Sequence, residues 1–464
     1  MEDYRSRIHE TDKKILALVK ERLTIGTEVA NFKHGRSLPI IDADAEQVTM
    51  NNLLESAQEL GIERAFAHRL GELLIEETVR VEDTTQPQMS KDQLMKEMFE
   101  LTQKLTRQGK KVTRFEIGEP NFPPSREVIR GLDSTFRKKK VVGYGPASGL
   151  PELRKAIASD LTRQHGTEID PEQVLITPGG RFAIFATITS YVSSLERVVI
   201  PQPAWPAYEE CVNFVRGRVI PIHTKFEDSW DIDLGLLETE LKKGARMLVL
   251  NTPSNPTGKV IGKKIFDQVV DVAAKYHSMI LSDEVYDRYV RSPSPSVLEN
   301  GCDNFVYINS FSKQFSLTGW RIAYLVTSKQ NVLRIRRVLQ TAITCVPEFI
   351  QNAALLAMKR ARGEAQRQIK AILEKVDLTC RELSKIDVSF HKPEGAFYVF
   401  PKANKPNFDS LAFARQLLEK HYVSITPGQS FGNYPEFFRL AVSLPRAQIP
   451  SAIKAIGAAI DSWP

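Results

Sequence analysis

The sequence is poor in the features that build disulfide frameworks, metal clusters and membrane spans. Its 464 residues include only four cysteines, Cys211, Cys302, Cys345 and Cys380, with no CxxC pair, and no HExxH motif occurs. No stretch approaches the ~18 consecutive apolar residues of a membrane-spanning helix. The N-terminal MEDYRSRIHE is charged where a signal peptide is apolar. These absences predict a cytoplasmic protein with reduced thiols and no metal site.

An excess of one charge sign is also missing. The 63 basic and 56 acidic residues leave a net charge of +7, spread along the chain rather than gathered in a tail. The densest basic run, at 137–140, is most simply a solvated helix end, and no basic cluster is interleaved with aromatic residues. This pattern argues against nucleic-acid binding and favours small anionic substrates. A hydrophobic content of 42% is enough for large cores.

Glycine and proline are scarce in residues 1–86, where apolar residues recur at helical spacing. The pattern predicts three helices, the first of them long. The apolar positions are Ile8, Ile15, Leu18, Ile25, Val29 and Phe32, then Leu53, Leu54 and Leu60, then Leu70, Leu73 and Leu74. The character of the sequence changes after DTTQPQMS at 83–90, which predicts a domain boundary there.

From about residue 112, short β-rich runs alternate with helical stretches. The runs are VLIT, RVVIP, RMLVLN, SMILSD, FVYIN and RIAYLV, and their alternation with helices predicts a mostly parallel sheet in an α/β fold. Three polar clusters, TPSNPTG, DEVY and SFSK, directly follow such strands. Because ligands bind at the carboxyl ends of parallel strands, these clusters are expected to converge on one site.

These clusters form a compound motif: NPTG at 255–258, D-x-x-Y at 283–286, S-x-S-K at 310–313, and an arginine eight residues later at Arg321. With these motifs, residues 89–464 resemble the class I/II aminotransferases of fold type I, which use pyridoxal 5'-phosphate. The resemblance implies a large domain at about 128–355 with a mostly parallel central sheet flanked by helices. It also implies a small α+β domain at about 89–127 plus 356–464, and a homodimer.

The resemblance also implies the roles of the residues around the cofactor ring. Lys313 would bind the cofactor covalently and carry the proton to and from the substrate, a task suited to a lysine with a lowered pKa. Asp283 would face the pyridine nitrogen and keep it protonated. Asn255 and Tyr286 would hydrogen-bond the ring's phenolic oxygen. Trp205 would stack on the ring and line the substrate site, although a simple core tryptophan is the alternative.

The phosphate of the cofactor would be held by both halves of the predicted site. Arg321 offers a bidentate fork, and Ser310 and Ser312 offer hydroxyls. Gly179 and Gly180 would let backbone N–H groups at a helix start approach the same phosphate, and Arg181 follows them in the cofactor-binding segment. Tyr144 matches the tyrosine that reaches the phosphate of the neighbouring subunit, so it too implies a dimer.

The substrate residues implied by the resemblance are fewer. Arg439 would bind the α-carboxylate of the substrate, Gly118 would leave room for it, and Asn255 would lie beside it. No second arginine for a side-chain carboxylate is evident. The sequence therefore leaves open which amino acids and 2-oxo acids are accepted.

Two cations lie within the apolar stripe of the first predicted helix. Arg22 and Lys33 are 11 residues apart, so at about 100° per residue they point within roughly 20° of each other, about 16 Å apart. Arg5 points about 100° away. Snorkelling side chains on an ordinary bundle are the simple interpretation. Cations that face a buried anionic substrate are the functional one.

With YRSRIHETDKKILALVKERLTIGTEVANFK, PIID and LLIEETVRVE, residues 1–86 resemble the all-helical AroQ-type chorismate mutases. The resemblance implies that Arg22, and Arg5 of a partner protomer, hold the carboxylates of chorismate, and that Lys33 and Glu82 bind its ether oxygen. The residues implied to support the substrate's hydroxyl and carboxylate are Asp42, Glu46 and Thr78. Catalysis would come from trapping the compact conformer and stabilising charge on the ether oxygen.

The chain departs from that family's usual pattern in two places. Ala45 precedes Glu46 where members often have arginine, and Glu82 stands where many bacterial members have glutamine, although fungal relatives share the Thr and Glu combination. Because a glutamate donates only when protonated, an active site of this kind should favour acidic conditions. Gln86, one turn later, is the alternative partner.

Together these features predict a bifunctional enzyme that converts chorismate to prephenate and transaminates prephenate or aromatic 2-oxo acids, with glutamate or aspartate as donor. The first alternative is an aspartate or aromatic aminotransferase with a non-catalytic regulatory or dimerisation module in front. A lyase or decarboxylase on the same scaffold is the second. A transcription regulator would need a DNA-binding unit, and the inward charges of the first helix argue against one.

Overall fold

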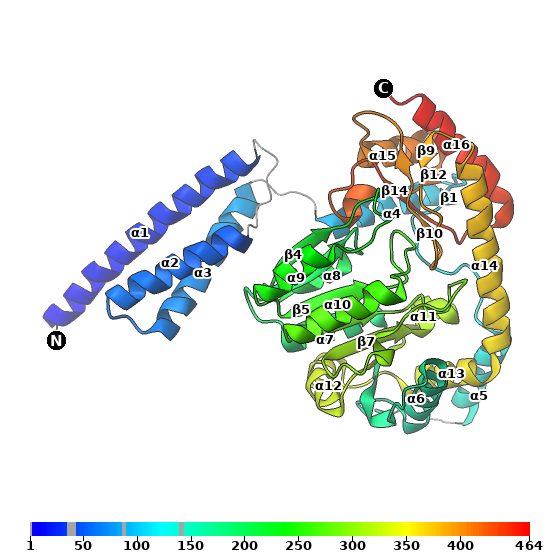
Figure 1. Cartoon of the computed structure of the whole chain (residues 1–464), viewed down its shortest axis with the longest axis horizontal. Helices are drawn as coiled ribbons and strands as arrows, with labels where there is room; N and C mark the ends of the chain where they lie inside the picture. The colour runs from blue at the N-terminus through cyan, green and yellow to red at the C-terminus, as the bar shows by residue number, and fades with distance from the viewer. Residues whose placement is uncertain (1, 35–42, 86–89, 139–142) are drawn as a thin grey trace. The chain divides into compact units, whose positions relative to one another are not determined.

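The computed structural model describes residues 2–34, 43–85, 90–138 and 143–464, which divide into two compact units at Met89 and Ser90. The first unit is all helical and consists of α1 (Glu2–His34), α2 (Ala43–Glu59) and α3 (Arg64–Thr85). The predicted three helices, the first of them long, are therefore confirmed (Figure 1). Helix α3 packs against both others.

Close packing in the first unit is concentrated on α3. A Cβ added at Gly26 of α1 would lie 2.8 Å from Cγ2 of Thr78 on α3, so the glycine allows the two helices to approach. The buried apolar side chains include Met50, Leu54 and Ile75. Much of the apolar stripe on α1 is instead exposed, including Ile8 and Ile15, with 60% and 53% of their surface accessible. One copy of this unit therefore leaves an apolar face of α1 uncovered.

The second unit contains a seven-stranded sheet in the order β2-β8-β7-β6-β5-β3-β4. Strand β8 runs antiparallel to its neighbours β2 and β7, and the other adjacent pairs are parallel. The predicted mostly parallel sheet is confirmed. The strands are β2 (Val174–Thr177), β3 (Arg197–Gln202), β4 (Arg218–His223), β5 (Met247–Asn251), β6 (Met279–Asp283), β7 (Phe305–Ser310) and β8 (Ala323–Val326).

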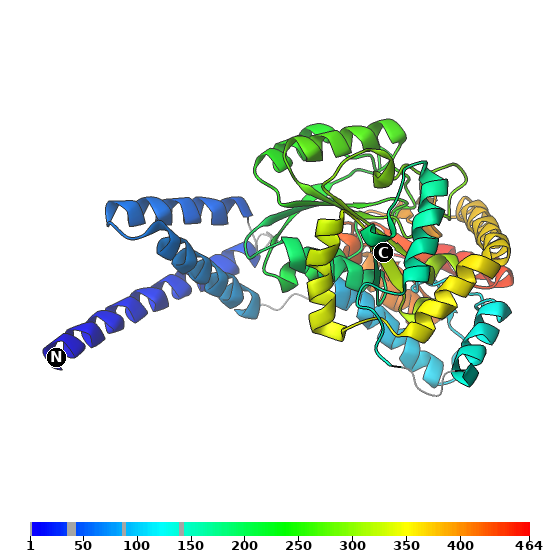
Figure 2. The same ribbon diagram turned by 90° about the horizontal axis from the view of Figure 1, so that it is seen from below.

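Helices cover both faces of this sheet (Figures 1 and 2). On one face, α7, α8 and α12 pack on alternating strand residues such as Val198, Met247 and Leu281. Because the intervening residues, for example Leu248 and Ile280, are buried as well, the central strands read as continuous apolar runs. The flanking helices are α6 (Pro151–His165), α7 (Gly180–Tyr191), α8 (Ala207–Phe214), α9 (Leu234–Lys242), α10 (Lys263–Lys275) and α12 (Lys329–Ile343).

The rest of this unit combines segments from both ends of its sequence around a second apolar core. Met98 and Phe115 from the start of the unit pack there with residues beyond 369. The helices are α4 (Lys91–Arg107), α5 (Arg126–Lys138), α13 (Glu348–Arg360), α14 (Arg362–Leu383), α15 (Ser410–His421) and α16 (Ile449–Asp461). Short strand pairs complete it: β1 (Thr113–Arg114) with β12 (Val423–Ser424), β9 (Val388–Ser389) with β11 (Lys402–Ala403), and β14 (Phe438–Ala441) with β10 (Tyr398–Val399) and β13 (Thr426–Pro427).

Helix α4 has a well-defined start, which matters because the helix borders the site described below. Ser90 accepts from the Gln93 backbone N–H, and the Gln93 side chain accepts from the Ser90 N–H, forming a capping box. Among the described residues, no helix combines the length and apolar character that crossing a bilayer requires.

Candidate active site

A cavity of about 410 Å³ lies at the carboxyl ends of β5, β6 and β7. These strand ends and the start of α7 line it, together with α4 and residues 116–119. The sequence-predicted residues that line it are Gly118, Gly180, Arg181, Trp205, Asn255, Asp283, Tyr286, Ser310, Ser312, Lys313, Arg321 and Arg439. Tyr144 does not line the cavity of its own chain and is 90% exposed.

Lys313 extends into this cavity from the short helix α11 (Phe311–Gln314). Its Nζ donates to the Gly118 carbonyl oxygen at 2.6 Å and lies 5.7 Å from the centre of the Tyr286 ring. Burial lowers the pKa of the Lys313 amine to about 8, although the nearby Glu119 carboxylate acts in the opposite direction. The amine can therefore lose its proton close to neutral pH, which a nucleophile or proton carrier requires.

Asp283, the last residue of β6, is buried at the floor of the cavity. Its Oδ2 accepts from the Tyr208 hydroxyl at 2.7 Å, and its Oδ1 accepts from the Val285 N–H at 3.4 Å. Burial raises the pKa of the carboxyl to about 6, and the bond from Tyr208 limits the rise. The carboxylate is largely ionised at neutral pH and would favour a cationic partner within the cavity.

Asn251 connects Asp283 to the NPTG segment, and sequence reasoning did not mark it. Its Nδ2 donates to the Asp283 carbonyl oxygen at 2.9 Å, and its Oδ1 accepts from the Asn255 N–H at 2.7 Å. The only sequence signal was its place at the end of β5, because a strand-end asparagine is also a common turn residue.

Arg439, on β14, is almost completely buried with 2% exposure. Its guanidinium carbon lies 4.8 Å from the centre of the Tyr398 ring and 5.0 Å from that of Phe431. Its Nη1 donates to Asn255 Oδ1 at 2.9 Å, and its Nη2 donates to the Glu116 carbonyl oxygen at 2.6 Å. Burial lowers the pKa of the guanidinium. The buried cation has lost part of its hydration, so a bound anion would stabilise it.

The other end of the cavity gathers groups that suit a phosphate. Helix α7 starts at Gly180, where the first backbone N–H groups have no acceptor within the helix. Gly179 has φ +93°, and a Cβ there would lie 2.3 Å from Nη2 of Arg321. The glycine therefore gives Arg321 access to the helix start. Ser310 caps α11 by accepting from the Ser312 N–H at 3.1 Å and donates its hydroxyl to the Ile322 carbonyl oxygen at 3.2 Å.

Arg181 occupies a place that sequence reasoning did not foresee. Its guanidinium lies 4.9 Å from the centre of the Trp205 ring, and its Nη2 donates to Asp92 Oδ1 at 3.3 Å. Lys96, one turn along α4, also pairs with Asp92 at 2.6 Å. Arg181 is thus a third arginine in the cavity besides Arg321 and Arg439, and the sequence did not show its pairing with Asp92 because the two residues are 89 positions apart.

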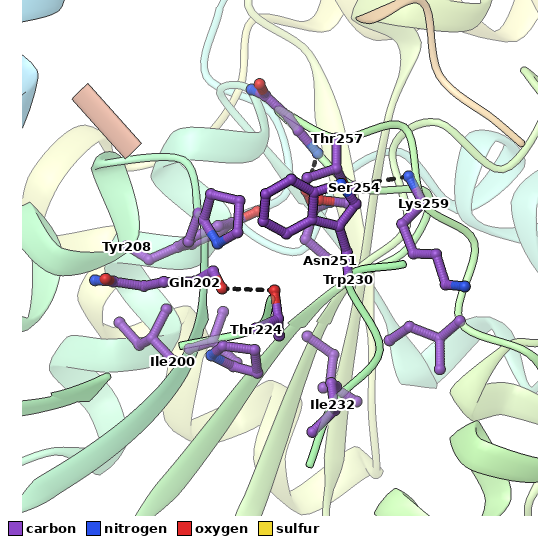
Figure 3. A pocket seen from close by; sticks show the side chains of 17 residues that line it. Ile200, Gln202, Tyr208, Thr224, Trp230, Ile232, Asn251, Ser254, Thr257 and Lys259 are labelled. Atoms are coloured by element: carbon purple, nitrogen blue, oxygen red, sulfur yellow. Dashed lines mark hydrogen bonds between the residues drawn. The ribbon is translucent and has the colours of Figure 1, made fainter. Parts of the chain in front are cut away.

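A much smaller pocket of about 50 Å³ is lined in part by Ser254 and Thr257 (Figure 3). Tyr208, Asn251 and Asn255 line both this pocket and the large cavity. In its wall the Thr224 hydroxyl donates to the Gln202 carbonyl oxygen at 2.8 Å. Its volume accommodates about one or two water molecules, so a substrate or cofactor must use the large cavity.

In the helical unit, the structure brings Arg22 and Thr78 together. Nη1 of Arg22 donates to the Leu74 carbonyl oxygen at 2.6 Å and forms a short hydrogen bond with the Thr78 hydroxyl. Burial lowers the pKa of the Arg22 guanidinium. Lys33 and Glu46 are half-buried. Arg5 is exposed.

Three further residues predicted for this site cannot be placed. Asp42 lies outside the described residues, as does Gln86, the alternative partner. Glu82 belongs to α3, but its side chain is not among those described.

Two family models match the chain in separate regions. "Aminotransferase class I and II" matches residues 110–456, and "Chorismate mutase type II" matches residues 4–83. The chain therefore belongs to the class I and II aminotransferases, which depend on pyridoxal phosphate, and carries a chorismate mutase domain in front. This confirms the predicted fusion and the fold type of both parts.

Individual proteins agree with this assignment. An aspartate aminotransferase from Sulfolobus acidocaldarius is 31% identical over 369 residues, covering 76% of this chain and 91% of the relative. A probable aspartate/prephenate aminotransferase from Aquifex aeolicus is 29% identical over 369 residues, covering 77% and 93%. The crystal structure of aspartate aminotransferase from Thermotoga maritima has a TM-score of 0.75 at 29% identity, covering 80% of this chain and 97% of that one.

The cavity residues fit the family's cofactor. Lys313 provides a buried amine for an aldehyde, and Asp283 provides a buried carboxylate for a pyridinium nitrogen. Gly179, where a Cβ would strike Arg321, and the start of α7 form a cradle for a phosphate. Amine, carboxylate and phosphate cradle all line the same cavity.

The raised pKa of Asp283 gives a stability prediction. Its folded pKa of about 6 exceeds the ordinary value of 3.8, so ionisation of Asp283 costs the folded protein stability as pH rises through that window. The difference, 6 − 3.8, is about 2 pKa units, or about 3 kcal/mol for a fully buried group. In cofactor-free protein at pH 8, we therefore expect Asp283→Asn to be more stable than wild type by about 2–3 kcal/mol.

Urea unfolding of cofactor-free protein between pH 4 and pH 8 measures this effect. The advantage of Asp283→Asn should shrink as the pH falls through 6 towards 4. The exposed Asp228→Asn is the matched control and should show no such gain. An Asp283→Asn variant less stable than wild type at pH 8 would show that the cavity compensates the buried charge.

Proposed function

We propose that the chain is a bifunctional enzyme that rearranges chorismate to prephenate and transfers an amino group from glutamate or aspartate to prephenate or to aromatic 2-oxo acids. The observation that carries the transaminase part is the buried Lys313 amine in one cavity with Asp283 and Arg439. The chorismate mutase model on the same chain supports the choice of acceptor. In this proposal the first domain makes prephenate, and the second domain uses it as the amino acceptor.

In the proposed transaminase site, each residue acts on a defined atom. When bound, pyridoxal phosphate supplies an electron sink for the electrons of the substrate's Cα–H bond. Lys313 holds the cofactor and then carries the proton at Cα, since its amine is neutral in a substantial fraction near pH 8. Asp283 keeps the ring nitrogen protonated, Asn255 and Tyr286 bind the ring oxygen, and Trp205 covers the ring.

The remaining groups bind phosphate and carboxylate. Arg321, Gly180 at the start of α7, and the Ser310–Ser312 segment hold the phosphate. Arg439, already oriented by Asn255 and two aromatic rings, receives the α-carboxylate beside Gly118.

The wall formed by α4 supports a substrate that has both a ring and a second carboxylate. Met95 and Phe99 present apolar surface to the cavity. Lys96 and Arg181 lie beside them, and both contact Asp92, which a substrate carboxylate would replace as their partner. Prephenate has both a ring and a second carboxylate. Aromatic 2-oxo acids would use the apolar surface, and the donors glutamate and aspartate would use the cations.

For the mutase site, Arg22 supplies a half-buried cation for a chorismate carboxylate, with Thr78 and Glu46 supporting the substrate's polar groups. Lys33 and Glu82 would donate to the ether oxygen as negative charge develops there. The rearrangement needs no nucleophile, because its barrier falls when the reactive conformer is held and the developing charge is stabilised.

A homodimer is part of this proposal. The exposed apolar side chains of α1 would be covered by a second copy, which would also bring Arg5 to the partner's mutase site. In the second unit, the 90% exposed Tyr144 would reach the partner's phosphate. We assign residues 1–86 to the mutase domain and 89–464 to the transaminase. Within the latter, 128–355 form the large domain and 89–127 plus 356–464 the small domain.

The experiment uses the full chain, chorismate and glutamate labelled with ¹⁵N in its amino group. The expected result is the appearance of prephenate followed by a ¹⁵N-labelled amino acid derived from it. Pyridoxal phosphate omission should stop the second step but not the first. Prephenate absent at every pH between 5 and 8, with intact transfer to added 2-oxo acids, would leave the helical domain a non-catalytic module.

A further inference from the structure

Besides Tyr208 and Tyr286, the cavity contains a third tyrosine, which no sequence motif marks. Tyr398 begins β10, is 1% exposed and lines the cavity. Its hydroxyl lies 2.6 Å from the hydroxyl of Tyr286, and the two rings meet edge to face at 5.4 Å and 86°. Tyr286 is itself only 4% exposed, so water does not easily replace either partner.

Hydrogen counting makes this pair informative. Each phenol has one hydrogen, so only one of the two hydroxyls can donate to the other. The tyrosine that accepts keeps its own hydrogen for a third group. If Tyr398 donates, the hydrogen of Tyr286 is available to the cavity; if Tyr286 donates, it is not.

Two features favour Tyr398 as the donor. Burial raises the pKa of both phenols. The Arg439 guanidinium, 4.8 Å from the Tyr398 ring, counteracts this rise chiefly at Tyr398, which makes Tyr398 the stronger donor. In addition, the Tyr398 hydroxyl is packed on Gly118, where a Cβ would lie 2.3 Å from its oxygen. The Tyr286 ring lies beside the Lys313 amine instead.

We propose that Tyr398 is a positioning residue: it donates to Tyr286, leaving the Tyr286 hydrogen for the ring oxygen of bound pyridoxal phosphate, and its ring holds Arg439 for the substrate carboxylate. This inference rests on the proposed transaminase function. It also explains why position 118 is glycine, because any side chain there would displace the Tyr398 hydroxyl from Tyr286.

The two tasks of Tyr398 can be separated by substitution. Tyr398→Phe keeps the ring on Arg439 and removes only the hydroxyl. Tyr398→Leu removes both, so the Arg439 guanidinium loses one of its two aromatic neighbours. We expect KM for the amino donor to stay within about twofold in Tyr398→Phe and to rise about tenfold in Tyr398→Leu.

The spectrum of the bound cofactor reports the hydroxyl. A hydrogen bond donated to the ring oxygen favours its ionised form and lowers the pKa at which the chromophore changes colour. Tyr398→Phe should therefore raise this pKa by about 0.5, since Tyr286 loses the bond that orients and strengthens it as a donor. Tyr286→Phe should raise it further, and adding Tyr398→Phe to Tyr286→Phe should cause no additional change.

Tyr434→Phe is the matched control. Its hydroxyl lies 2.8 Å from the Gln202 carbonyl oxygen and 3.1 Å from that of Thr224, which share its one hydrogen, and it does not line the large cavity. It should lower stability without moving the chromophore pKa. An unchanged or lowered pKa in Tyr398→Phe overturns the inference alone, because a lowered value means that Tyr286 was donating to Tyr398. A wild-type protein that takes up no pyridoxal phosphate overturns the proposed function as well.

Discussion

Replacing Lys313 with alanine is expected to lower amino transfer by at least about a thousandfold while leaving the chorismate rearrangement unchanged. The variant lacks both the amine that holds the cofactor and the group that moves the Cα proton, and loss of a general base alone costs about 10²–10⁴ in rate. The helical domain uses no residue of the second unit in the proposed chemistry, so its rate serves as an internal measure of folding. Steady-state assays of both reactions on one preparation measure the effect.

Lys375→Ala is the matched control for that experiment. Lys375 is a half-buried lysine of α14 whose Nζ donates to the Ser443 and Leu444 carbonyl oxygens, and it does not line the cavity. Its loss should lower stability but leave amino transfer within a few-fold of wild type. Retained transfer in Lys313→Ala would refute the assignment of the nucleophile.

The second large effect concerns Arg22. We expect Arg22→Ala to slow the chorismate rearrangement by about 10²–10³, or about 3–4 kcal/mol, because it removes the half-buried cation that, in the proposed site, binds a substrate carboxylate. Amino transfer should not change. Initial rates of chorismate consumption across pH 5 to 8 measure the loss.

Arg22 also contacts the Leu74 carbonyl oxygen and Thr78, so its replacement affects packing between α1 and α3. Arg22→Lys keeps a cation there and should recover part of the rate, whereas a purely structural role predicts a rate that follows only the fraction of folded protein. Arg69→Ala, on the exposed face of α3, is the control. An unaltered rate in Arg22→Ala would discredit the active mutase.

The strands could be predicted from the sequence because the sheet is buried on both faces. Continuous runs such as VLIT at 174–177 and MLVLN at 247–251 form strands with those bounds. The clustering of Asp283 and Lys313 followed as well, since both stand at carboxyl ends of neighbouring strands. Local pattern and topology were sufficient for these elements.

Other parts of the site depend on contacts between distant segments, which one sequence does not reveal. Arg181 faces Asp92 on α4, and Tyr398 meets Tyr286 across 112 residues. The short strand at Tyr398 has only two residues, too few for a recognisable alternation. Periodicity also predicted the helix α1 correctly but not that much of its apolar stripe would be exposed in one copy, because a spacing pattern does not say which surface covers it.

The lowered pKa of Lys313 and the raised pKa of Asp283 share one cause, burial in the same cavity. Each group is less stable as an ion there than in water, so each gains from an opposite charge on a ligand. A ligand with charges opposite to these two groups would therefore bind more tightly here than in an uncharged cavity. Without the cofactor the buried Asp283 carboxylate has no such partner, which is why Asp283→Asn is expected to be more stable than wild type.

The most direct test of the account is chemical trapping of the cofactor at Lys313. Purified protein incubated with pyridoxal phosphate, reduced with borohydride and digested should yield one modified peptide, containing residues 310–321, with the cofactor on Lys313. Protein that acquires no absorbing group, or that carries the modification on another lysine while retaining amino transfer, would contradict it.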